Sequence, residues 1–306
     1  MARPLNLRAL ERVLAALDAP RNGSALFALL ATLCTAGLLL AMAESALARE
    51  DALWGSIWSG LALAVTFYGI NTTGMLLMDQ ASGRPIREVE DAMKEALLRS
   101  HKVLMSLAIV LFVVALPMAA LLGLLLLVKQ PWIGAPLFGA LVPLGVTFCG
   151  LFALAVLVIV GPLTGPSIWA GNTARATARM CWRQFRHGLI EAAALMLAVI
   201  ALTGAVTAAI SFIVVSGARV MALLSVWWVG IDLPPQQLMA GLFGYGLRAL
   251  GAAGAPVAAS PLGVAALIGG GVVFALALAL PTLVYLRGCC AVYLALREGE
   301  QGEQGE

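Results

Sequence analysis

Charged side chains are scarce in this sequence. Aspartate, glutamate, lysine and arginine make up 11% of the 306 residues, whereas 61% of the residues are hydrophobic. A water-soluble domain of this length needs far more charge to cover its surface. Several apolar runs also reach the roughly 20 residues that a membrane-spanning helix requires. The composition therefore excludes one large soluble core and predicts an all-α integral membrane protein.

Histidine and cysteine are also rare. The two histidines stand alone, and none of the five cysteines forms a Cys-x-x-Cys pair. Metal sites need clustered ligands, and disulfide frameworks need regularly spaced cysteines. We therefore predict no metal site, no cofactor and no disulfide framework. The net charge of +3 is too small to indicate a nucleic-acid partner.

Common enzyme motifs are absent as well. The chain has no His-Glu-x-x-His, no Gly-x-Ser-x-Gly and no phosphate-binding loop. Ion-coupled transport usually needs ionisable residues within the membrane, and the centres of the spans predicted below contain none. We therefore predict a protein without catalytic residues and disfavour a proton-coupled pump. A carrier of neutral or lipidic molecules remains open.

Six apolar runs are long enough to be membrane spans. They cover residues 24–43, 53–77, 103–128, 135–160, 189–215 and 261–286. Residues 216–260 are predicted to form a far-side insert of short interfacial or re-entrant helices. One integral membrane domain then comprises residues 1–297, and the polar residues 298–306 are predicted to form a disordered tail.

Cytoplasmic amphipathic helices are predicted before spans 1, 3 and 5. Before span 3, apolar residues recur at steps of three and four along one helical face: Ile86, Val89, Met93 and Leu97. Glu90 and Lys94 lie four residues apart on the opposite side, in the favourable order. Such a helix can lie at the membrane surface, with its apolar face in lipid or against a protein partner.

The helix before span 5 carries the most basic surface of the sequence. Four arginines share one of its faces: Arg175, Arg179, Arg183 and Arg186. We interpret this face first as a positive-inside loop. Binding of anionic lipid headgroups or of an acidic protein partner is the alternative, since each arginine near anionic lipid contributes on the order of 1 kcal/mol.

The basic residues also predict the orientation of the chain. Of the 19 lysines and arginines, only four fall on the far side of the predicted spans: Arg49, Lys129, Arg219 and Arg248. Cytoplasmic loops of membrane proteins are enriched in these residue types. Both termini are therefore predicted to be cytoplasmic.

Polar residues gather near the end of span 2. Asp79, Gln80 and Arg84 are near enough in sequence to interact, although we interpret them first as a turn and a helix start. Asn71 is predicted to face other helices, because an amide in lipid needs a hydrogen-bonding partner. A carrier would instead line a cavity with polar residues from the spans: Asn71, Thr72 and Thr147.

Prolines interrupt spans 3 and 4. Pro117 removes a backbone donor from the middle of span 3, and Pro143 does so within span 4. Both helices are therefore predicted to be kinked. The glycines and prolines of residues 161–166 are predicted to end span 4, because they favour a turn.

The region around the basic helix resembles a known family. Its order is Gly-Pro-Ser-Ile-Trp-Ala-Gly-Asn, an alanine-rich helix with spaced arginines, Trp-Arg-Gln-Phe and a long apolar span. This order, together with Asp-Ala-Met-Lys-Glu-Ala-Leu-Leu-Arg-Ser before span 3, resembles bacterial six-helix proteins related to the membrane domain associated with glycerophosphodiesterases. The resemblance covers residues 86–215. It implies a bacterial inner-membrane location and transfers no catalytic residue.

Two functional hypotheses follow from the sequence. The first is a non-enzymatic accessory or scaffold subunit that docks partners through its cytoplasmic amphipathic helices. The alternative is a transporter or lipid-handling protein with a cavity between the kinked spans 3 and 4.

Overall fold

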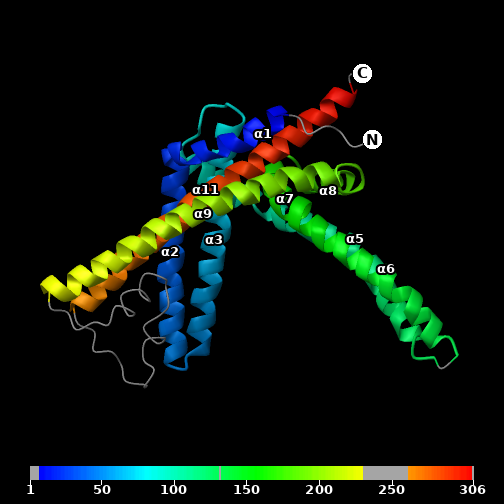
Figure 1. The fold of residues 1–306 in the computed structure, drawn as a ribbon, viewed down its shortest axis with the longest axis horizontal. Helices are drawn as coiled ribbons and strands as arrows, with labels where there is room; N and C mark the ends of the chain where they lie inside the picture. The colour runs from blue at the N-terminus through cyan, green and yellow to red at the C-terminus, as the bar shows by residue number, and fades with distance from the viewer. Residues whose placement is uncertain (1–6, 131, 230–260, 305–306) are drawn as a thin grey trace. The chain divides into compact units, whose positions relative to one another are not determined.

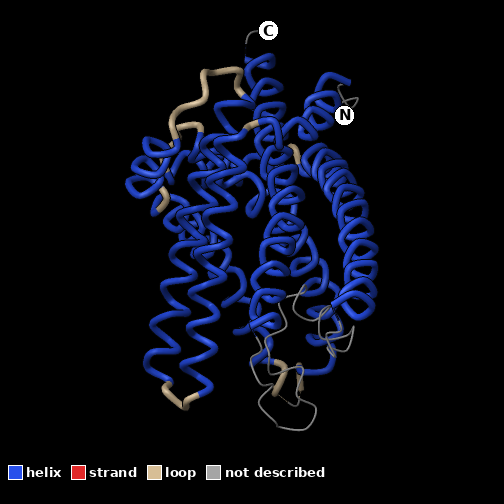
Figure 2. Tube along the Cα trace, turned by 90° about the vertical axis from the view of Figure 1, so that its left-hand side faces the viewer, coloured by secondary structure: helices blue, strands red, loops and turns tan. Residues whose placement is uncertain are grey.

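The computed structural model describes residues 7–130, 132–229 and 261–304 (Figure 1). Among these residues every regular element is a helix, and no strand occurs (Figure 2). Six helical stretches are long and apolar enough to cross a membrane. These findings confirm the predicted helical fold with six helices that could span a membrane.

The six candidate spans are longer than the spans predicted from the apolar runs. They cover Gly23–Ala48, Ala52–Ala81, Val89–Leu127, Gly134–Trp169, Leu189–Met221 and Gly269–Gly299. Each predicted span overlaps one of them. The helices extend beyond the apolar runs because continuing a helix costs much less than starting one.

The helices and helical turns have the following bounds. In chain order they are α1 (Leu7–Leu14), η1 (Ala15–Arg21), α2 (Gly23–Ala48), α3 (Ala52–Ala81), α4 (Val89–Arg99), α5 (His101–Leu127), α6 (Gly134–Ala155), η2 (Val156–Val160), α7 (Gly161–Trp169), α8 (Ala174–His187), α9 (Leu189–Leu224), η3 (Ser225–Val229) and α11 (Pro261–Gln304). The element η1 is a 3₁₀ helix, whereas η2 and η3 are π-helical turns.

The described residues group into two compact units, where the sequence indicated one domain. The first unit draws on residues 1–16, 74–199 and 286–306, and the second on residues 17–73 and 200–285. The helices α3, α9 and α11 each contribute to both units. A continuous helix carries no linker signal, which is why the sequence did not indicate this division.

The helix before span 3 buries alanines rather than its larger apolar residues. In α4 the buried residues are Ala92 and Ala96, whereas Met93 and Leu97 are about half exposed, at 50% and 53%. The small alanine side chains allow close packing on neighbouring helices. The larger side chains are therefore left for lipid or for a partner.

Span 4 continues through the residues that were predicted to end it. The helix runs on through Gly161 and Pro162 to Trp169. A proline has no backbone N–H, and here the π-helical turn η2 precedes Pro162, with the N–H of Gly161 bonded to the carbonyl oxygen of Val156. The wider turn absorbs the irregularity, so the prediction of a helix end was wrong.

The close approach of α3 to α7 requires a glycine at position 74 of α3. A Cβ atom on Gly74 would lie 2.3 Å from the ring of Trp169, and one on Gly165 would lie 2.8 Å from the same ring. Such distances leave no room for a side chain. The buried Trp169 therefore packs directly on the backbone of α3.

Two further predictions on the second half of the chain need correction. Residues 216–224 belong to α9 and not to a separate insert, while residues 230–260 lie outside the described residues. The polar tail is helical as far as Gln304, because its glutamates and glutamines favour the continuation of α11.

Candidate functional site

A tight turn between α7 and α8 positions the basic helix. Gly171 has a positive φ of 98°, and its backbone N–H donates to the carbonyl oxygen of Ile168 near the end of α7. This is the usual way in which a glycine ends a helix. The side chain of Thr173 then accepts a hydrogen bond from the backbone N–H of Ala176 and caps α8.

The helix α8 buries one face and exposes its arginines. Its buried face packs against α5, α7 and η2 and consists of Ala174, Thr177, Cys181 and Gln184. The hydroxyl of Thr177 lies 2.9 Å from that of Ser167 in α7. All four predicted arginines are exposed: Arg175, Arg179, Arg183 and Arg186.

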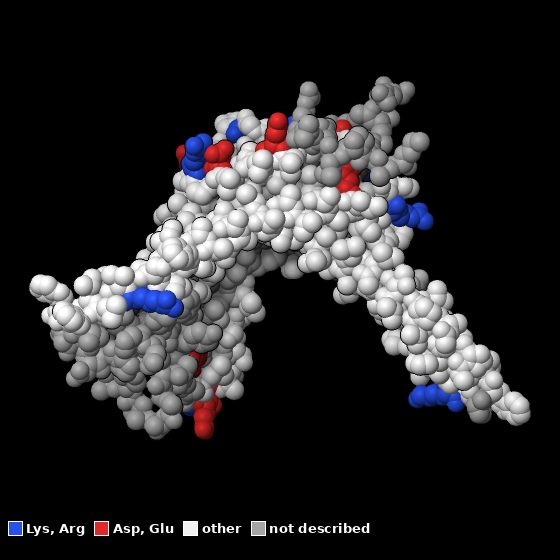
Figure 3. Space-filling view, viewed as in Figure 1, with Lys and Arg blue, Asp and Glu red and all other residues white. Residues whose placement is uncertain are grey.

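A cavity of about 820 Å³ lies between α5, α6, η2 and α8. The antiparallel helices α5 and α6 contribute most of its wall, and their surface is uncharged over most of its length (Figure 3). Among the described residues that line the cavity, only Arg175 and Arg179 are charged. The apolar lining includes Val113, Pro117, Phe148, Phe152, Trp182 and Phe185.

The helix α8 contributes aromatic rings and a thiol to this cavity. The ring centroids of Trp182 and Phe185 lie 5.9 Å apart, and the guanidinium of Arg186 lies 5.3 Å from the centroid of the Trp182 ring. Burial raises the pKa of the Cys181 thiol to about 11. A thiol with this pKa stays protonated at neutral pH and is a poor nucleophile. The Cys181 thiol is therefore suited to packing rather than to covalent chemistry.

The structure separates the four predicted arginines into different environments. Arg175 and Arg179 line the cavity. Arg183 lines a second pocket, beside α11, to which Arg179 also contributes. Arg186 lines neither of these hollows. The basic face is thus not one uniform surface, and only part of it can reach a ligand in the cavity.

The carboxylate of Asp79 pairs with Arg87, whereas Arg84 bonds to Asp79 through its backbone N–H, which donates to the Asp79 carbonyl oxygen at 3.0 Å in the expected turn. The Nε and Nη2 atoms of Arg87 lie 2.6 and 2.8 Å from the two carboxylate oxygens of the buried Asp79. Arg84 donates instead to the hydroxyl of Ser82, at 3.4 Å. The side chain of Arg84 misses the Asp79 carboxylate because Gly83, with a φ of 66°, reverses the chain immediately before Arg84.

The ion pair at Asp79 extends into α4. Arg87 also donates to Glu95, and Glu95 in turn pairs with Arg99 at 2.7 Å. The hydrogen bond to Asp79 raises the pKa of the Arg87 guanidinium above its ordinary value. This chain of charges joins the end of α3 to α4, so its role is structural.

Asn71 and Thr72 lie in one compact unit, and Thr147 lies in the other. Asn71 and Thr72 are buried on α3 and donate to the carbonyl oxygens of Phe67 and Tyr68, at 2.8 and 2.9 Å. Thr147 is exposed on α6 and belongs to the other compact unit. None of these three residues lines the cavity. Each of the two α3 side chains thus donates one hydrogen bond within its own helix.

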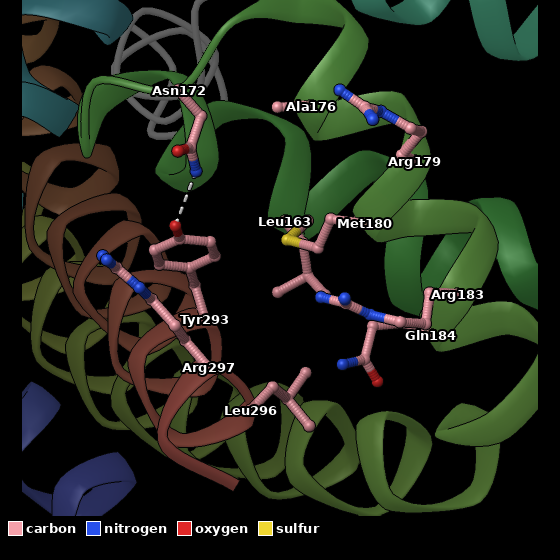
Figure 4. Close-up of a pocket in the computed structure, with 10 residues that line it drawn as sticks. All are labelled: Leu163, Asn172, Ala176, Arg179, Met180, Arg183, Gln184, Tyr293, Leu296 and Arg297. Carbon is pink, nitrogen blue, oxygen red and sulfur yellow. Dashed lines mark hydrogen bonds between the residues drawn. The ribbon is translucent and has the colours of Figure 1, made fainter. Parts of the chain in front are cut away.

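Asn172 and Tyr293 join two distant parts of the chain, which no sequence pattern indicated. The Nδ2 atom of Asn172 donates to the hydroxyl oxygen of Tyr293 at 2.8 Å (Figure 4) and to that of Ser167 at 3.0 Å. Tyr293 is buried on α11, 121 residues further along the chain. A tyrosine within an apolar run was the only available signal.

Comparisons of the chain with protein-family models, with curated proteins and with solved structures gave no match. Within the described stretches, no group of three or more histidine, cysteine, aspartate or glutamate side chains could hold a metal ion.

Proposed function

We propose that this protein binds one anionic, long-chain membrane lipid in the cavity between α5, α6 and α8. The observation that carries the proposal is an apolar lining that includes two guanidinium groups and no carboxylate. A phospholipid has the matching chemistry, because it combines an apolar chain with an anionic phosphate. The protein is then a lipid-handling membrane protein without catalytic residues.

The size of the cavity supports this occupant. Its volume of about 820 Å³ falls within the range of about 300–1,000 Å³ that is typical of ligand sites. Such a volume accommodates one acyl chain and its phosphate, while the remainder of the lipid stays in the bilayer.

Selection among lipids is expected to come from the headgroup. The tails of the bilayer are as apolar as the cavity, so moving a chain from one to the other gains little free energy. Arginine guanidiniums, in contrast, bind phosphate oxygens through two parallel hydrogen bonds. Arg175 and Arg179 are the side chains placed for this contact.

We further infer that α8 and both termini lie on the cytoplasmic side of a bacterial inner membrane. The strong bias of basic residues toward the segments that include α4 and α8 supports this orientation. The cytoplasmic leaflet is also the one that carries negative surface charge, as the proposed ligand requires.

An accessory or scaffold role is our second candidate. The half-exposed Met93 and Leu97 of α4 favour it, since they offer an apolar surface to a protein partner. A scaffold does not require a lipid in the cavity. A measurement of bound lipid can therefore distinguish the scaffold from the lipid-binding protein.

Native mass spectrometry of the gently extracted protein tests the proposal. We expect the natural protein to retain a single anionic phospholipid. The double substitution Arg175→Gln and Arg179→Gln is expected to reduce the retained lipid about 30-fold, since each arginine contributes about 1 kcal/mol.

The matched control is Arg186→Gln, which removes the same charge from the same helix outside the cavity. It should change lipid retention by no more than about twofold. The proposal would be contradicted if the double variant retained as much lipid as the natural protein. It would also be contradicted if the natural protein retained only a zwitterionic lipid. A defined complex with another protein and without lipid would favour the second candidate.

A further inference from the structure

A second pocket lies on the other flank of α8, between α7, α8 and the end of α11 (Figure 4). Its volume is about 350 Å³. Arg179 is the one residue that it shares with the lining of the apolar cavity. The residues that line the pocket are Leu163, Asn172, Ala176, Arg179, Met180, Arg183, Gln184, Tyr293, Leu296 and Arg297.

The pocket gathers three guanidinium groups and no carboxylate. Arg179 and Arg183 come from α8, and Arg297 comes from α11. Among the described residues, no carboxylate forms an ion pair with Arg179 or Arg297. Three positive side chains around one pocket favour an anion within it.

A neighbouring hollow differs from this pocket in containing an acid. That hollow also borders Arg297, but it contains Glu298, which pairs with Arg12 at 2.8 Å. Its positive charge is thus partly compensated within the protein. No carboxylate lines the pocket beside α8, which makes it the better anion site of the two.

The wall of the pocket is fixed by buried polar groups. The hydroxyl oxygen of the buried Tyr293 accepts a hydrogen bond from Asn172, and its own hydrogen stays available as a donor. Asn172 is held in turn by Ser167, whose hydroxyl contacts Thr177 of α8. Helices α7, α8 and α11 are thereby locked together around the pocket.

We propose that this pocket binds a phosphate group, carried either by a small soluble phosphate or by a lipid headgroup. Guanidinium forks match phosphate oxygens in geometry and charge, and a tyrosine hydroxyl adds a neutral donor. A positive-inside bias alone does not account for the arrangement, because it requires no convergence of distant residues. The inference goes beyond the apolar cavity, since Arg183 and Arg297 do not line that cavity.

The test uses the full chain in phosphatidylcholine nanodiscs. In one arm, isothermal titration calorimetry measures the binding of inorganic phosphate. In the other, the rise in melting temperature is measured when phosphatidic acid is added to the nanodisc. The variants are Arg297→Gln and Arg183→Gln, which change exposed side chains and leave the buried wall intact. Circular dichroism checks their helical content.

We expect each variant to weaken phosphate binding at least about tenfold, while Arg175→Gln leaves it unchanged. A response to phosphatidic acid but not to inorganic phosphate also supports the site and identifies its ligand as a lipid headgroup, if it persists in the Ala178→Trp background, where the apolar cavity is blocked, and is lost when Arg297→Gln or Arg183→Gln is added. Binding of inorganic phosphate, or of phosphatidic acid in the Ala178→Trp background, that survives Arg297→Gln and Arg183→Gln overturns the proposal. So does binding that is lost in Arg175→Gln, because that residue lines only the apolar cavity.

Discussion

At the scale of single residues, the pair of Asp79 and Arg87 is the most buried of the ion pairs between described residues. The Asp79 side chain is 3% exposed and that of Arg87 is 24% exposed. Removing Asp79 takes away the stronger partner of the Arg87 guanidinium, which then keeps its pair with Glu95. The contact therefore matters more for stability than the exposed pairs on α4.

The substitution Asp79→Asn is expected to lower the free energy of unfolding by about 2–3 kcal/mol, less than for a fully buried pair because Arg87 is partly exposed. Thermal unfolding in detergent, followed by tryptophan fluorescence, checks this value. Glu90→Gln is the control, because the pair of Glu90 and Lys94 is 69% and 63% exposed and is expected to change stability by no more than about 0.5 kcal/mol. Equal losses in the two variants would show that burial of Asp79 has no special effect.

Cys181 makes the stability of the protein depend on pH in the alkaline range. Burial raises the pKa of its thiol from 9.0 to about 11 in the folded protein. The unfolded chain therefore loses this proton first as the pH rises. The contribution of the protonated Cys181 thiol to stability is complete at a pH below the pKa of the unfolded chain. It disappears as the pH rises to the pKa of the folded protein.

Compared with Cys181→Ala, the natural protein is expected to lose about 1.4 kcal/mol of stability for each pH unit across this window. Melting temperatures at about pH 8 and about pH 10 provide the check. Comparing the slopes removes the constant cost of the missing sulfur atom. Parallel slopes in the two proteins would exclude a buried, titrating Cys181.

At the scale of the element, α8 lies between the apolar cavity and the basic pocket. Two of its residues that are only two positions apart line different hollows. Ala178 lines the apolar cavity, and Ala176 lines the basic pocket. The two positions are 200° apart around a helix, since each residue turns it by about 100°. Two tryptophan substitutions can therefore block the two hollows one at a time.

The substitution Ala178→Trp is expected to reduce lipid retention at least about tenfold, because the indole occupies the apolar cavity. Phosphate binding should stay unchanged in this variant. Ala176→Trp should have the reverse effect on the two ligands. Native mass spectrometry and calorimetry measure the two responses, and a variant that affected both ligands equally would show that the hollows are not separate.

Helix existence was predictable from the sequence, but the exact helix ends were not. Apolar runs of about 20 residues require spanning helices, and all six overlap helices of the structure. The helix break expected at Gly161 and Pro162 was replaced by the π-helical turn Val156–Val160. Sequence patterns report where a proline occurs, but they do not show whether the preceding turn can widen around it.

At the scale of the whole molecule, contacts between distant residues were beyond the reach of the sequence. The four arginines of α8 followed from helical periodicity, whereas Arg297 and Tyr293 of the same pocket lie more than a hundred residues later. Asp79 and Arg84 were near in sequence, yet the turn at Gly83 places Arg87 on the carboxylate instead. Local spacing predicts faces of helices, and only the packed structure shows which faces meet.

Arg179 lies in the walls of both hollows on α8. With the two ligands proposed above, a phosphate held on one side withdraws positive charge from the other, so the two ligands antagonise each other. Thermodynamic linkage makes this antagonism equal in both directions. A shared guanidinium thus lets the lipid occupancy of the membrane segment respond to the amount of anion at its surface.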